Sequence, residues 1–134
     1  PSLFNSNHII TPHAKEMEDL LQKADSVDVQ LDSKKLTILL KGVTDTVTWF
    51  ENDEKKQVII TGGNEGMTKG GTGDVLAGLV AALYCTNTAQ VSAAIASFVN
   101  KRAGDELYKA VGPFFNASDL VEQVPKSLWQ EIID

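Results

Sequence analysis

A glycine-rich stretch, TGGNEGMTKGGTGDVLAG at residues 61–78, constrains the fold of this 134-residue chain more than any other segment. It holds seven of the ten glycines, and glycine lets a backbone adopt positive φ and come close to a ligand. The run Val58–Ile60 before it predicts a strand, and the alanine-rich apolar run Val75–Leu83 after it predicts a buried helix. A helix start carries unpaired N–H groups and a partial positive charge, so we expect Gly70–Gly73 to surround an anion such as phosphate.

Asp74 would lie in the first turn of that helix. A carboxylate repels phosphate, so we do not expect Asp74 to bind the anion directly. It is placed to accept a proton from a hydroxyl group that attacks a phosphoryl group. The alternative is that Asp74 only caps the helix, and the spacing alone leaves the two interpretations open. The loop lacks the Gly-Lys-Ser/Thr ending of a P-loop and the G-x-G-x-x-G spacing of a dinucleotide site.

Charge and composition argue against several classes of function. The net charge is −6 and the pI about 4.8, which disfavours a nucleic-acid partner. No apolar run is long enough to cross a membrane and no signal peptide is visible, so we expect a cytoplasmic protein. Two histidines and one cysteine offer no zinc site, and we expect no metal held by the protein alone. Cys85, at the end of the apolar helix, is predicted to be a small core side chain.

The N-terminal region predicts a strand, a turn and a helix. His8–Ile10 is a short apolar run, and Pro12 after it suits a helix start. If His13 is the N-cap, Glu16 lies at position N3 and can reach back as in a capping box. In the segment Gln22–Lys35 that follows, alternating valines allow a short edge strand, and the segment has few other patterns.

The central region predicts three strands and a loop. Leu36–Leu40 is continuous and apolar, and Lys41 follows at the strand end, where it can meet a phosphate or remain solvated. Thr46–Phe50 and Lys56–Ile60 predict an antiparallel hairpin with a four- or five-residue loop. Asn64, at the approach to the anion loop, can hydrogen-bond a phosphate or water, or serve only as a turn residue.

The C-terminal third predicts helices. Asn87 or Thr88 can cap a helix with Val91, Ile95 and Phe98 at helical spacing, and its alanines allow close packing against the sheet. Ser118 is a good N-cap for a following helix, and Pro125 predicts the start of a further turn.

Three motifs, in the same order, resemble a known family. The string GGTGDVLAG at residues 70–78 resembles the anion hole and catalytic aspartate of the ribokinase-like superfamily. The longer string from Gly63 to Gly78 resembles its prokaryotic ADP-dependent NAD(P)H-hydrate dehydratases, as do ITPHAKEM at 10–17 and LLKGVTDTV at 39–47. The resemblance implies an α/β fold with a mostly parallel sheet flanked by helices. Residues 1–134 would form the C-terminal, nucleotide-binding portion of that domain, without the half that supplies much of the hydrate pocket.

The resemblance also implies roles for individual residues. Asp74 would be the catalytic base and would contact the hydrate together with His13 and Asn64. For His13 the alternative remains a helix cap. The residues implied to bind the nucleotide are Lys41, Gly42, Val43, Thr44, Asp45, Gly71, Thr72 and Gly73.

The implied reaction restores NADH or NADPH from its (6S)-hydrate, NADHX or NADPHX, with ADP as phosphoryl donor, or ATP in its place, and Mg²⁺. A homo-oligomer and an NAD(P)HX epimerase, as a partner or fused domain, are the implied associates, and a truncated sheet edge favours self-association. The first alternative is another small-molecule kinase of the ribokinase-like superfamily. The second is a non-catalytic nucleotide-binding fragment that needs its N-terminal half.

Overall fold

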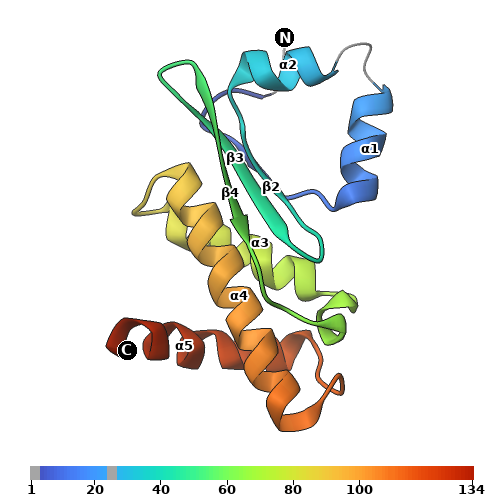
Figure 1. Ribbon diagram of the computed structural model, residues 1–134, viewed down its shortest axis with the longest axis vertical. Helices are drawn as coiled ribbons and strands as arrows, with labels where there is room; N and C mark the ends of the chain where they lie inside the picture. Colours follow the sequence, from blue (N-terminus) through green and yellow to red (C-terminus); the bar gives the residue numbers. More distant parts are fainter. Residues whose placement is uncertain (1–3, 24–26) are drawn as a thin grey trace.

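The computed structural model describes residues 4–23 and 27–134, which fold into one small sheet with helices on both of its faces (Figure 1). The strands are β1 (Ile9–Ile10), β2 (Thr37–Leu40), β3 (Asp45–Glu51) and β4 (Glu54–Ile60). The helices are α1 (Ala14–Lys23), α2 (Val27–Lys34), α3 (Thr72–Tyr84), α4 (Ala89–Val111) and α5 (Ala117–Ile133), with a short 3₁₀ turn, η1, at Glu65–Thr68.

The sheet has the order β1-β2-β3-β4 and is mixed. β1 pairs with β2 in parallel, whereas β2 with β3 and β3 with β4 are antiparallel. The α/β class with flanking helices is therefore confirmed, but the expected predominance of parallel pairing is wrong for the described strands. The reason is the length of the connections: the links after β2 and β3 are only a few residues long, and a parallel crossover needs a dozen or more.

The two faces of the sheet bury separate apolar clusters. On one face, Leu39 and Val47 of the sheet pack with Leu76 and Val80 of α3 and with alanines of α4. On the other face, Leu31 and Leu36 pack with apolar side chains of α1 and of the two parallel strands. Figure 1 shows α1 and α2 on one side of the sheet and α3 and α4 on the other. The alternating burial of β2 follows from the period of two along a strand.

Two local predictions around the sheet are wrong. The hairpin turn has two residues, Asn52 and Asp53, between the pair Glu51 and Glu54, rather than four or five. Both turn residues have positive φ, 51° and 64°, which Asn and Asp tolerate and which suits the twist of a tight hairpin. The segment with alternating valines is helix α2 rather than an edge strand, because the helix buries Leu31 in the apolar cluster that includes Leu36 and side chains of α1.

Helix α4 packs on the sheet through its small residues. Thr88 caps it, as expected, with its side chain accepting from the Val91 N–H group. Ala93, Ala96 and Ala103 are fully buried, which confirms close packing. Val91, Ile95 and Phe98 are instead about 40% exposed, at 40%, 38% and 41%. The polar side chains of Ser97, Asn100 and Lys101 are buried in their place.

The last helix begins earlier than predicted and runs past its proline. Asn116 is the N-cap of α5 and forms a capping box with Asp119, so the expectation for Ser118 is wrong. Pro125 lies inside the helix instead of opening a turn. Cys85 is exposed, which corrects its assignment to the core. In the described part of the chain, no helix is long and apolar enough to span a membrane.

Candidate nucleotide-binding site

Several chain segments meet at one edge of the sheet. The segments that leave β1 and β2 pair at His13 and Lys41, and the Lys41 N–H group donates to the Pro12 carbonyl at 2.9 Å. Asp45, which opens β3, pairs with Ile60, which closes β4, so the glycines after Ile60 lie at the same edge. The carboxyl ends of strands are where open α/β sheets place ligands, and the predicted site residues are gathered there.

The start of α3 has the geometry of an anion site. Gly71 is its N-cap with φ of 90°, a conformation that favours glycine. The Thr72 hydroxyl donates to the Met67 carbonyl at 2.6 Å and fixes the loop. The amides of Gly73 and Asp74 have no acceptor among the described residues, as expected in a first helical turn. A Cβ at Gly73 would lie 3.3 Å from the Lys41 Nζ, so the ammonium group of Lys41 lies close to Gly73 at the start of α3.

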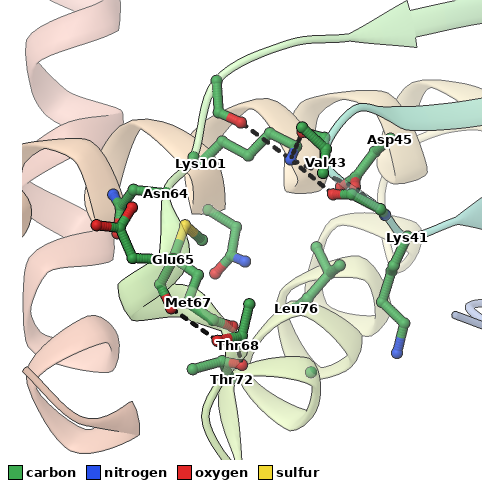
Figure 2. A pocket seen from close by; sticks show the side chains of 15 residues that line it. Lys41, Val43, Asp45, Asn64, Glu65, Met67, Thr68, Thr72, Leu76 and Lys101 are labelled. Atoms are coloured by element: carbon green, nitrogen blue, oxygen red, sulfur yellow. Dashed lines mark hydrogen bonds and ion pairs between the residues drawn. The ribbon is translucent and has the colours of Figure 1, made fainter. Parts of the chain in front are cut away.

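A pocket of about 520 Å³ opens beside this helix start. Figure 2 shows labelled side chains from the strand ends, η1, α3 and α4 around it. Its volume lies within the ordinary range of about 300–1,000 Å³ for small-molecule sites. The predicted site residues that line it are Lys41, Gly42, Val43, Asp45, Asn64, Thr72 and Gly73.

Lys101 of α4 holds two walls of the pocket together. Its buried Nζ lies 3.4 Å from the Asp45 carboxylate and donates to the carbonyls of Val43 at 3.2 Å and Gly62 at 3.1 Å (Figure 2). The Asp45 carboxylate also accepts from the Gly42 N–H group at 3.0 Å and from the Ser97 hydroxyl at 2.7 Å. Asp45 therefore shapes the loop after β2 from inside the protein rather than facing the pocket as a free charge.

Asn64 serves as a tether in this structure. Its Oδ1 accepts from the Gly66 N–H group at 3.0 Å and caps η1. Its Nδ2 donates to the Gly104 carbonyl at 3.0 Å and to the Asp105 carboxylate at 3.1 Å. Asn64 has φ of −155°, so it is an extended cap residue rather than a left-handed turn residue, and contact with a substrate remains a prediction.

Four predicted residues lie outside the lining of the pocket: His13, Thr44, Gly71 and Asp74. Asp74 is exposed in the first turn of α3, and Gly71 rather than Asp74 is the N-cap of this helix. The interpretation that Asp74 caps the helix therefore has no support in the geometry, and Asp74 stands in the same helical turn as the free amides.

His13 does act as a helix cap. Its Nδ1 accepts from the Glu16 N–H group at 3.2 Å, and its own N–H group donates to the Glu16 carboxylate at 2.8 Å. This backbone hydrogen bond lowers the pKa of Glu16, and the charge of nearby Lys41 acts in the same direction. The cap does not remove the ring from reach, because His13 is exposed beside Lys41.

Sequence reasoning missed Asn100 and Lys101, both of which line the pocket. The signal was present: polar residues at 97, 100 and 101 interrupt the small apolar residues of α4 at helical spacing. Their partners are far away in the sequence, so the role of the two residues emerged only in the fold.

The described residues of the site offer few ligands for a metal ion. Within the described ranges, no group of three or more His, Cys, Asp or Glu side chains could hold an ion. Mg²⁺ commonly takes one or two carboxylates together with substrate phosphates and waters, so the site fits Mg²⁺ that arrives with a nucleotide. The ion would then be held mainly through the phosphates of the nucleotide and through water.

The α/β sheet flanked by helices, with a glycine-rich helix start at one edge, places the chain in the ribokinase-like fold class. The family follows from comparison. A model of the family described as NAD(P)H-hydrate dehydratase matches residues 2–126, and the chain belongs to this family.

The curated relatives of this chain belong to the same family. The chain is 42% identical to the bifunctional NAD(P)H-hydrate repair enzyme Nnr of Methanocaldococcus jannaschii, over 93% of this chain and 24% of that protein. It is 35% identical to the ADP-dependent (S)-NAD(P)H-hydrate dehydratase of Nitrosopumilus maritimus, over 92% of this chain and 45% of that protein. The chain thus spans less than half the length of these relatives.

Solved structures share the fold. A ribokinase-like superfamily protein from Enterococcus faecalis superposes with a TM-score of 0.73 at 27% identity, over 96% of this chain and 46% of that one. The ADP/ATP-dependent NAD(P)H-hydrate dehydratase from Bacillus subtilis, co-crystallised with ATP and Mg²⁺, gives 0.72 at 22% identity, over 91% and 47%. The second likeness supports the fold alone.

Proposed function

We propose that this chain is the nucleotide-binding portion of an ADP-dependent NAD(P)H-hydrate dehydratase. One observation carries the proposal: the Lys41 ammonium lies close to Gly73 at the start of α3, in the same helical turn as the free amides of Gly73 and Asp74 and the exposed Asp74 side chain. A terminal phosphate fits between a cation and unpaired amides, and a free carboxylate next to it fits a general base. The family match and the ADP-dependent relatives support the choice of ADP.

In the proposed reaction, the Asp74 carboxylate takes the proton of the C6 hydroxyl group of NADHX or NADPHX. The hydroxyl oxygen forms a bond to the β-phosphorus of ADP while the bond to the bridging oxygen breaks, and AMP leaves. Phosphate then leaves C6 as a ring proton is lost, which restores the dihydronicotinamide. Lys41 and the amides of Gly73 and Asp74 stabilise the charge on the transferred group. Mg²⁺, when bound with the nucleotide, would neutralise part of the phosphate charge.

Asp74→Asn tests the base. We expect turnover of NADHX to be lost while the Kd for ADP changes little, because the side chain keeps its shape and loses only its basicity. Turnover is followed by the absorbance of the NADH formed, and ADP binding by calorimetric titration. Asp19→Asn, an exposed aspartate of α1, is the matched control and should turn over normally. Unchanged turnover in Asp74→Asn would contradict the assignment of Asp74 as the general base.

The share of the relatives' length that this chain spans favours a second candidate function, nucleotide binding without catalysis. Because the chain spans 45% of the dehydratase relative, it can bind ADP without turnover unless a further segment completes the hydrate pocket. Saturable ADP binding together with no NADH formed by the wild-type chain selects this candidate. Another ribokinase-like kinase would instead leave a phosphorylated product that accumulates.

The proposed partners follow from the same comparisons. NADHX, NADPHX and ADP are the small molecules, and the bifunctional relatives suggest an associated NAD(P)HX epimerase activity. Edge strand β4 exposes Val58 and Ile59, which supports self-association. A cytoplasmic location is part of this proposal.

A further inference from the structure

Almost all polar side chains that line the pocket form hydrogen bonds or ion pairs with other groups of the chain. Six of these side chains make hydrogen bonds or ion pairs within the chain: Asp45, Asn64, Glu65, Thr68, Thr72 and Lys101. Only the side chains of Lys41 and Asn100 make none among the described residues. Lys41 faces the anion loop, so Asn100 remains as the polar group whose role in the pocket is unexplained.

Asn100 is a costly residue to leave without a partner. It is 5% exposed on the inner face of α4, and its Oδ1 is buried without a hydrogen-bond donor among the described residues. A buried acceptor without a donor destabilises the fold, whereas an apolar side chain of the same shape would not. A donor that enters the pocket with a ligand would complete this amide.

The surroundings of Asn100 suit an apolar ligand with a polar edge. Leu76 of α3 lines the pocket and is 3% exposed. Met67 packs against α4 one turn beyond Asn100, since a Cβ at Gly104 would overlap the Met67 side chain. The pocket therefore combines apolar walls, one free amide and an anion site. Those are the parts needed for a nucleobase and for a phosphate.

We propose that Asn100 is a specificity residue that recognises the amino group of adenine. An asparagine amide offers an acceptor beside a donor, and adenine offers its 6-amino donor beside a ring-nitrogen acceptor. Hypoxanthine carries an oxygen at position 6 and a proton on N1, so its donor and acceptor are exchanged and do not match the Asn100 amide in the orientation that fits adenine. The inference rests on the proposed function, because it names the base of the nucleotide that Lys41 and Gly73 hold by its phosphates.

Affinities for ADP and IDP test the proposal in the wild-type chain and in Asn100→Leu, whose side chain has a similar shape. We expect the wild type to prefer ADP about tenfold, the factor that 1.4 kcal/mol produces. Asn100→Leu should bind ADP about tenfold more weakly and IDP as before, so the preference disappears. Asn87→Leu, an exposed asparagine outside the pocket, should keep the preference.

The outcomes separate the base assignment from the nucleotide site. A wild-type chain that binds ADP and IDP equally overturns the role of Asn100 and leaves the ADP proposal standing. A chain that binds neither overturns the nucleotide site and the base assignment with it. A preference for ADP over IDP that persists in Asn100→Leu also overturns the base assignment.

Thermal unfolding without nucleotide gives a readout that a purely structural asparagine would not give. We expect the midpoint of Asn100→Leu to equal or exceed that of the wild type, because the unsatisfied oxygen is removed. A clear fall, with ADP and IDP weakened equally, means that Asn100 supports only the fold. Asn100→Ser, which leaves a small polar side chain, should show the same loss of preference if the leucine variant does not fold.

Discussion

At the scale of single residues, Lys101 shows how a charge can be buried in a small protein. A buried ammonium is unfavourable unless it is paired and hydrogen-bonded. Here Asp45 supplies the countercharge, and the carbonyls of Val43 and Gly62 take further hydrogen bonds. The sequence motif predicted that Asp45 belongs to the site, but it could not predict the lysine, because the partners come from other segments.

Replacing this lysine should destabilise the fold and the site together. We expect Lys101→Met to lower the free energy of unfolding by about 3–5 kcal/mol, because Asp45 keeps a buried charge without its partner. Chemical denaturation measures the change, and ADP titration should show weaker binding because the loop after β2 is released. Lys109→Met, an exposed lysine paired with Glu106, should change stability by less than about 1 kcal/mol. Similar losses of stability in both variants would contradict the role of Lys101 in holding the two walls of the pocket together.

At the scale of elements, packing overrides local propensity in several places. Pro125 removes a backbone donor inside α5, yet the helix continues, and Leu120 and Ser127 on either side of it are buried. The α2 segment alternates like a strand but is helical, because Leu31 belongs to the cluster against α1. Strands and helices with strong patterns, such as β2, α3 and α4, were predicted correctly as to type.

The start of α5 offers a matched pair of substitutions. Asn116 accepts from the Asp119 N–H group at 3.0 Å, and the Asp119 carboxylate accepts from the Asn116 N–H group at 2.9 Å. We expect Asn116→Ala to cost about 1 kcal/mol of stability, because the cap is lost. Ser118→Ala, two residues later in the same helix, should change stability by less than about 0.5 kcal/mol. Thermal or chemical denaturation measures both changes in stability, and equal losses of stability in the two variants would refute the assignment of Asn116 as the cap.

At the scale of the whole molecule, the pocket is assembled from segments distant in the sequence. The ends of β2 and β4, the turn η1, and helices α3 and α4 all contribute to it. A ligand that bridges them stabilises the folded state against unfolding, since the unfolded chain holds no such site.

ADP should therefore raise the stability of the wild-type chain. At a concentration 100 times its Kd, we expect about 2.7 kcal/mol, visible as a higher thermal midpoint. Adenosine, which lacks phosphate, should produce a much smaller shift. Lys41→Ala should need more ADP for the same shift, because the cation facing Gly73 is gone. A folded wild-type chain whose thermal unfolding midpoint does not change with ADP would contradict the nucleotide site.

The sequence by itself determined the glycine-rich loop, the strand before it and the helix after it, because these depend on neighbouring residues and on short-range periodicity. It also placed Lys41 at a strand end and Asp74 in a first helical turn. Only the tertiary structure decided that Asp45 is buried against Lys101, that Asn64 tethers η1 to α4, and that Asn100 lines the pocket. Those roles depend on distances between segments far apart in the chain. Side-chain burial and satisfied hydrogen bonds set such distances, and no local pattern records them.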